Sequence, residues 1–143
     1  TFTQNQFKTM SDKNTNRVEH LRQNYDSNPL TKENLIKMSN KVTEVTKDIL
    51  PEQDIDCVVY GCTSGTIAAG YNSIEQKVKA AKPMAEVTTP STAAIKALKK
   101  LNIKKLCIFT PYSKKLNDEV LEYFKDEGFG EFSGGKDFMS PDL

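Results

Sequence analysis

The sequence predicts an α/β fold in which short parallel strands alternate with helices. Two observations predict it. Segments 55–60, 84–88 and 105–110 are short and rich in apolar or β-branched residues, as buried strands are. Each is followed by a longer segment whose apolar positions recur every three or four residues, as on one face of a helix. This alternation is typical of βαβ units with parallel strands and right-handed crossovers.

The first 30 residues are polar and predict mostly irregular structure, with one short strand around Val18 to Leu21. Thr31 is then a good N-cap for a first helix, which Pro51 ends. The inner face of this helix is expected to consist of the apolar residues at helical spacing, Leu35, Met38, Val42, Val45 and Ile49.

Residues 55–60, IDCVVY, predict a strand that is covered on both faces, because almost all of its side chains are apolar. Helix signals resume at once and continue to Pro83, with Ile67, Tyr71, Ile74, Val78 and Ala81 on the inner face. The pattern then repeats as strand 84–88, helix 91–101, strand 105–110, helix 114–127 and a last strand at 129–132. In helix 91–101 the inward positions are Ala94, Ile95, Leu98 and Leu101.

Charge and composition narrow the class of protein. The 20 Lys and Arg nearly balance the 19 Asp and Glu, so the net charge of +1 gives no sign of nucleic-acid binding. No apolar run approaches the ~20 residues of a membrane span, and the N-terminus lacks the apolar core of a signal peptide. We therefore expect a soluble cytoplasmic protein that binds neither nucleic acid nor membrane.

The three cysteines are odd in number and have no tight pair spacing, which favours reduced thiols over disulfides or a zinc site. A single histidine, His20, excludes a histidine-rich metal cluster. Cys57 and Cys107 fall inside apolar strands, where we expect them to behave as small buried apolar residues. Cys62 is different, because it falls where a strand ends.

Three loops lead from the carboxyl end of a predicted strand into a helix: GCTSG at 61–65, TTPST at 88–92 and TPYS at 110–113. Ligands of open α/β sheets bind at this edge. The loops are rich in hydroxyl groups, and helix starts offer unpaired N–H groups, so we expect an anion site here.

In the first loop, the helix dipole and the unpaired N–H groups would favour the thiolate of Cys62, which makes it a candidate nucleophile. The alternative is inert packing at a strand end. In the other loops, Tyr112 could simply cover a core edge, and Ser91 or Thr92 could simply cap a helix.

Three segments, VVYGCTSGT, VTTPSTAAIKALKKLNIKKLCIFTPY and NPLTKENL, occur together in this chain. Together they resemble the aspartate/glutamate racemase superfamily, and most closely its branch of maleate cis-trans isomerase, arylmalonate decarboxylase and an ectoine-utilisation protein. The resemblance covers about residues 28–129. It implies two pseudo-symmetric flavodoxin-like α/β halves with the active site between them, and neither a metal ion nor an organic cofactor.

The resemblance also implies roles for residues. Cys62 matches the family's catalytic cysteine, as nucleophile or base, while Thr63, Ser64 and Tyr112 match positions that hold the substrate carboxylate. It therefore predicts an enzyme that isomerises or racemises a small carboxylic or dicarboxylic acid. The second half of such an enzyme contributes another cysteine across the substrate.

The chain departs from this pattern at both ends. The family's first strand is missing, and the sequence stops before a second cysteine at a strand end. We expect residues 1–104 to form the first half and 105–143 to begin an incomplete second half. The chain would then be a piece of a longer enzyme or an incomplete paralogue, in which self-association could cover exposed apolar surface. A non-catalytic domain that binds carboxylates or other anions is the alternative function.

Overall fold

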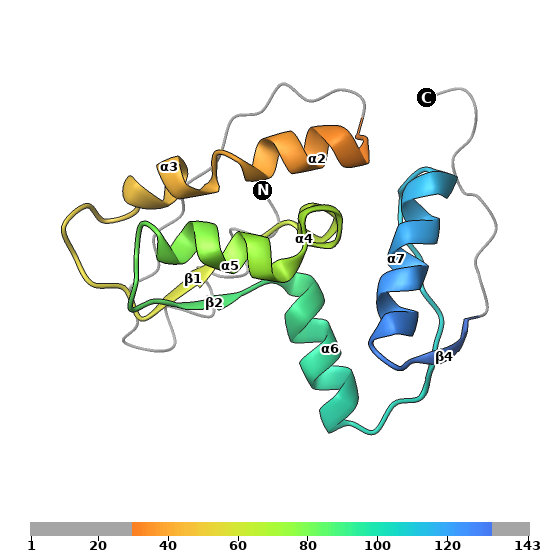
Figure 1. The fold of residues 1–143 in the computed structure, drawn as a ribbon. Coiled ribbons are helices and arrows are strands. Elements are labelled where there is room, and N and C mark those ends of the chain that lie inside the picture. The colour runs from red at the N-terminus through yellow and green to blue at the C-terminus, as the bar shows by residue number, and fades with distance from the viewer. Residues whose placement is uncertain (1–29, 133–143) are drawn as a thin grey trace.

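The computed structural model describes residues 30–132, which form helices and short strands in alternation (Figure 1). In chain order the elements are α2 (Lys32–Ser39), α3 (Val42–Lys47), β1 (Cys57–Val59), α4 (Thr63–Ala69), α5 (Tyr71–Lys79), β2 (Glu86–Thr88), α6 (Pro90–Lys100), β3 (Lys105–Leu106), α7 (Lys114–Asp126) and β4 (Gly130–Phe132). The short strand expected at 18–21 lies outside the described residues.

The strands pair in parallel, which confirms the predicted α/β class. β1 pairs with β2 in the register Cys57↔Glu86, Val58↔Val87 and Val59↔Thr88. β3 pairs with β4, also in parallel but with an irregular register, and these two strands form a separate two-stranded sheet. α6 leads from the first sheet toward the second, and α7 stands beside α4 (Figure 1).

Two helices that the sequence predicts as continuous are each broken in two. Gly70 has φ 80° and ψ 137°, a conformation that no helix residue adopts and that glycine reaches without steric cost, so α4 ends there and α5 begins. The first helix breaks at Asn40, whose N–H donates to the Lys37 carbonyl at 3.2 Å in a tighter turn. Lys77 of α5 holds this break, because its Nζ donates to Ser39 Oγ at 2.9 Å and to Asn40 Oδ1 at 3.2 Å.

Two apolar clusters form the core. The first packs α3 and α5 on one face of β1 and β2, through Val42, Val58, Ile74, Val78, Ala85 and Val87. The second joins α2, α4 and α7 through Leu35, Ala68 and Leu116. The N-cap predicted at Thr31 is confirmed, since its Oγ1 accepts the Asn34 N–H at 3.2 Å and starts the helix that carries Leu35.

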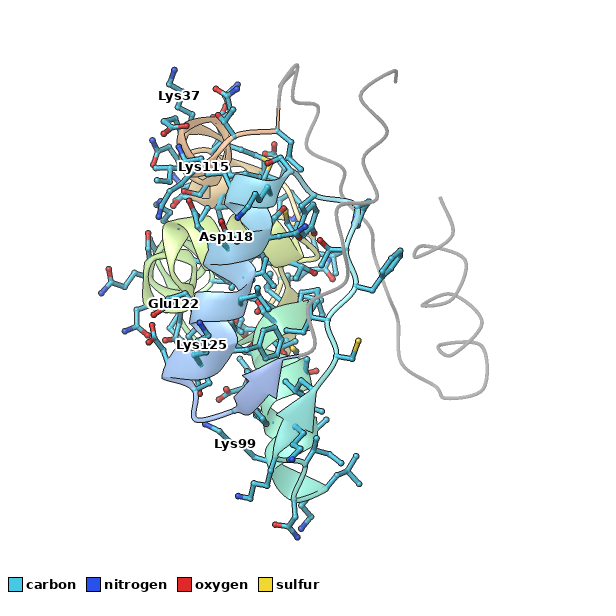
Figure 2. The ribbon with its side chains drawn as sticks, turned by 90° about the vertical axis from the view of Figure 1, so that its right-hand side faces the viewer. Lys37, Lys99, Lys115, Asp118, Glu122 and Lys125 are labelled. Atoms are coloured by element: carbon cyan, nitrogen blue, oxygen red, sulfur yellow. The ribbon has the colours of Figure 1, made fainter. Side chains whose placement is uncertain are left out.

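The outer surface of α7 is charged. Lys115, Asp118, Glu122 and Lys125 follow one another along it, away from the buried Leu116 and Val120 (Figure 2). Lys99 of α6 forms an ion pair of 2.7 Å with Glu127, just after α7. These alternating charges keep the face solvated and link the two helices.

The expectation that strand 55–60 is buried on both faces is wrong. Val58 is buried, but Val59 is 47% exposed and Cys57 is also exposed, because within residues 30–132 helices cover only one face of β1. Cys107 is exposed as well, since regular pairing of this strand is limited to Lys105–Leu106. The prediction of two buried strand thiols is therefore also wrong.

Among the inward positions predicted for α6, Ile95 is buried and Ala94 and Leu98 are partly covered. Leu101 is 69% exposed, because α6 ends at Lys100 and the chain turns away there. Its predicted inward orientation is wrong.

Neighbouring valines of β1 test this one-sided burial. Val58→Ala should lower the free energy of unfolding by about 1.5 kcal/mol more than Val59→Ala, since only the first removes buried methyl groups. Because both changes lie in the same strand, the difference in strand propensity cancels. Urea denaturation measures the two losses, and equal losses would show that the outer face is packed as tightly as the inner one.

Candidate active site

Cys62 lies where the sequence predicts it, at the end of the first strand and at the start of a helix. It is the N-cap of α4, with extended backbone angles of φ −123° and ψ 105°. Its Sγ accepts the N–H of Gly65 at 3.2 Å, so sulfur takes the place of the oxygen that usually caps a helix. Its carbonyl accepts the N–H and the hydroxyl of Thr66, at 3.0 and 2.7 Å. The positive end of the α4 dipole therefore faces the sulfur.

The chain approaches the sulfur closely at Gly65. A Cβ on Gly65 would lie 2.7 Å from the Tyr60 hydroxyl oxygen, 2.8 Å from Cys62 Sγ and 3.1 Å from Met38 Cε. Since these distances are below van der Waals contact, a side chain at this position would force the neighbouring side chains to move. The two residues before it differ in exposure: Thr63 is partly exposed, whereas Ser64 is buried with its hydroxyl 3.9 Å from the sulfur.

Tyr112 and Cys62, 50 positions apart in the sequence, meet at one apolar cluster. Both are half-buried and pack against the side chains of Leu35, Ala68 and Leu116. An ion pair of 3.3 Å between Lys32 and Glu119 also joins α2 to α7. The structure thus brings together the first and third of the predicted loops.

Asn117, which was not predicted from the sequence, fixes the Tyr112 loop. Its amide nitrogen donates to the Tyr112 carbonyl at 3.1 Å, and its side chain is also hydrogen-bonded to Thr110 Oγ1. That same threonine oxygen accepts the Tyr112 N–H at 3.3 Å. The available signal was an amide in the first turn of α7, directly after the inward Leu116.

The loop at 88–92 does not offer its hydroxyl groups to a ligand. Thr89 caps α6 in a reciprocal capping box with Thr92, with bonds of 3.2 and 3.1 Å. Thr89 and Ser91 are both buried, and their hydroxyl oxygens lie 3.3 Å apart. The expectation that all three loops present donors at one edge is therefore wrong for this loop, because its hydroxyl groups are used within the fold.

Two hollows in the structure lie away from Cys62. One of about 290 Å³ is lined by residues 52–55 and 81–85, where Lys82 Nζ donates to the carbonyls of Leu50 and Gln53 at 2.9 Å. The other, of about 240 Å³, lies between the C-terminal ends of α6 and α7. Neither hollow is lined by Cys62, Thr63 or Tyr112.

Among the side chains that the structure describes, no three of His, Cys, Asp or Glu lie close enough to hold a metal ion. None of the helices between residues 30 and 132 is long and apolar enough to cross a lipid bilayer.

Comparison with known proteins identifies relatives of one kind. No family model matches the chain. The chain is 29% identical over 87 residues to a maleate isomerase of Pseudomonas putida. This match covers 56% of the chain and 35% of that enzyme. The chain thus spans about a third of that relative's length.

Two solved structures have a similar fold. The maleate isomerase Iso from Pseudomonas putida S16 matches with a TM-score of 0.62 and 22% identity, over 73% of this chain and 46% of that one. A cysteine-to-alanine variant of Iso, solved with maleate, matches with a TM-score of 0.56 and 25% identity, over 73% and 45%. These matches show the α/β fold and support a distant relationship to the maleate isomerase branch.

The close approach at Gly65 can be tested with a matched pair of substitutions. Gly65→Ala should lower the free energy of unfolding by about 1 to 3 kcal/mol, because the added methyl group overpacks Tyr60, Cys62 and Met38. Gly61→Ala is the control, since its Cβ would meet nothing within 4 Å. Alanine normally favours a helix over glycine by about 1 kcal/mol, so a stabilised Gly65→Ala protein would contradict the crowding.

Proposed function

We propose that this chain belongs to a cofactor-independent isomerase that acts on a small dicarboxylic acid such as maleate, with Cys62 as the nucleophile. The observation that supports it most is that Cys62, at the head of α4, and Tyr112 pack against the same apolar cluster, in a fold similar to that of maleate isomerase. In this proposal residues 30–132 supply one wall of the site, and the rest of the second α/β half, which residues 105–132 begin, supplies the other.

The chemistry requires only a thiolate and a conjugated acid. The sulfur of Cys62 adds its electron pair to one alkene carbon, and the π electrons move toward the carboxylate on the other carbon. The carbons, now joined by a single bond, rotate. The electron pair then returns, the C–S bond breaks, and the other geometric isomer leaves with the thiolate restored.

Negative charge builds on the substrate carboxylate when the sulfur adds, and nearby donors would stabilise it. The N–H groups of Thr63 and Ser64 head α4, where a helix has no acceptor of its own for them. We assign the partly exposed Thr63 hydroxyl and the Tyr112 hydroxyl to the same carboxylate. The buried hydroxyl of Ser64 would act from beside the sulfur instead.

Addition and elimination need one thiolate, which Cys62 could supply, whereas a racemase would take its second base from the other half. A racemase of the two-base kind needs acid–base groups on opposite faces of one carbon. In residues 30–132, neither Cys57 nor Cys107 belongs to the apolar cluster around Cys62. Partial burial and the carboxylates of Glu86 and Asp56 also raise the pKa of Cys57, which makes it a poor base near neutral pH.

One observation favours the second candidate, a domain that binds carboxylates without catalysis. Cys62 lines neither of the two hollows described above. Such a domain would bind maleate equally well with serine at position 62, and would not isomerise it.

Protection from alkylation tests the site directly. Maleate should slow the labelling of Cys62 by iodoacetamide, because a ligand held by Thr63 and Tyr112 would cover the sulfur. Cys57 and Cys107 are exposed internal controls whose labelling should not change. Peptide mass spectrometry measures all three rates in one sample, and equal labelling of Cys62 with and without maleate would argue against a dicarboxylate site.

A second measurement addresses Tyr112. Tyr112→Phe should weaken maleate protection of Cys62 roughly tenfold, the usual effect of removing a hydrogen bond to a charged group. The labelling of Cys62 without maleate should stay the same, because the aromatic ring still packs against Leu116. Tyr123→Phe, on the far part of α7, serves as the control, and an unchanged protection constant for Tyr112→Phe would remove Tyr112 from the site.

A further inference from the structure

The hydroxyl group of Tyr60 is a buried donor to which the proposed mechanism gives no part. The ring packs against the apolar cluster of β1, β2, α3 and α5, which holds the side chain in place. The hydroxyl oxygen is buried and makes no hydrogen bond in the structure. Because nearly all buried polar atoms of native proteins are paired, this exception requires a physical reason.

The sulfur of Cys62 is the neighbouring acceptor. The Tyr60 hydroxyl oxygen and Cys62 Sγ both lie within 2.8 Å of the point where a Cβ on Gly65 would be. A tight turn brings the two residues together, since the Cys62 N–H donates to the Tyr60 carbonyl at 2.9 Å. The absence of a side chain at position 65 therefore leaves the hydroxyl and the sulfur facing one small space.

The hydroxyl keeps its proton in this setting. Burial, followed by the nearby charge of Cys62, raises the pKa of Tyr60 well above its ordinary value. Tyr60 can therefore donate a hydrogen bond at any pH at which the protein works, and it does not act as a base. The remaining side chains of the cluster around Cys62 are Leu35, Met38, Ala68, Leu116 and Tyr112, of which only Tyr112 can titrate.

We propose that Tyr60 is a positioning residue for Cys62, whose hydroxyl donates a hydrogen bond to the sulfur when the sulfur is negatively charged. A neutral thiol is a weak acceptor and would leave this donor without a strong partner. A thiolate is a strong acceptor, and the bond forms only with it. The Tyr60 hydroxyl thus stabilises the thiolate of Cys62, both before the sulfur adds to the substrate and when it leaves the substrate.

This inference rests on the proposed function for its purpose, but it can be tested without substrate. The test uses the full chain with Cys57 and Cys107 changed to serine, so that iodoacetamide labelling reports Cys62 alone. Tyr60→Phe is compared with Tyr71→Phe, because Tyr71 packs against the same cluster but donates its hydroxyl to the Val87 carbonyl at 3.0 Å.

For Tyr60→Phe we expect Cys62 labelling near neutral pH to slow about tenfold, the effect of one lost hydrogen bond to a charged group. The pH of half-maximal labelling should rise by about one unit, and the rates should converge at high pH. The melting temperature should fall less than in Tyr71→Phe, since the Tyr60 hydroxyl has no hydrogen-bond partner in the structure. Tyr71→Phe should give the opposite pattern, with a lower melting temperature and an unchanged pH profile.

A pH profile of Tyr60→Phe that coincides with that of the parent would overturn the inference. If this variant does not fold, the parent chain decides: the ¹³Cζ signal of Tyr60 should move over the pH range in which Cys62 becomes reactive, and should not move in Cys62→Ser. A constant signal would overturn the inference too. A shifted pH profile in Tyr60→Phe, without maleate protection of Cys62, would support the role of Tyr60 and contradict the proposed function. Maleate protection with an unshifted pH profile would support the proposed function and contradict the role of Tyr60.

Discussion

The close approach of the chain to itself at Gly65 is the constraint on which the candidate site depends. The N–H of Gly65 donates to the Cys62 sulfur at 3.2 Å, and the missing side chain leaves room for the Tyr60 hydroxyl and for Met38. The strand ladder runs one residue past β1, to the bond of 3.0 Å between the Tyr60 N–H and the Thr88 carbonyl, and the chain turns at once into α4. The sulfur is therefore fixed by backbone geometry rather than by a flexible loop.

The sheet of β1 and β2 is covered by helices on one face only, within residues 30–132, and this bears on function. Helices α3 and α5 cover one face of β1 and β2, while Cys57 and Val59 remain exposed on the other, and Phe109 is 70% exposed beyond β3. Exposed apolar surface of this kind marks a place of contact with another element, domain or chain. This exposed surface agrees with the match to the solved isomerase, which covers 46% of that enzyme. It also agrees with a site of which residues 30–132 form only one wall.

Much of this arrangement could be predicted from the sequence, for physical reasons. Helix starts at Thr31 and after Cys62 follow from local capping chemistry, and the parallel pairing follows from the alternation of strands and helices. The breaks at Asn40 and Gly70 were not predicted, because the apolar spacing continues through both. The structure shows them through the hydrogen bond from Lys77 to Ser39, beside the first break, and through the positive φ of Gly70 at the second.

The site shows the same division between local and tertiary information. We expected the loops of Cys62 and Tyr112 to share one edge of a sheet, but they follow strands of two separate sheets, and the cluster of α2, α4 and α7 brings them together instead. The roles of Asn117 and Tyr60 depend on tertiary contacts, with the Tyr112 carbonyl and with the space beside Gly65, that no sequence pattern encodes. Burial of Cys57 was wrongly expected because apolar composition says how a strand could be covered, and not whether it is.

We propose above all that Cys62 is a nucleophile beside a carboxylate site. The most direct test is covalent labelling of Cys62 by a dicarboxylate that contains an electrophilic carbon. Epoxysuccinate offers two carboxylates and a carbon that a thiolate can open. We expect a covalent adduct on Cys62 alone, formed at a rate that saturates with reagent concentration and falls when maleate is added. Adducts spread over Cys57, Cys62 and Cys107 at rates that rise linearly with concentration would contradict it.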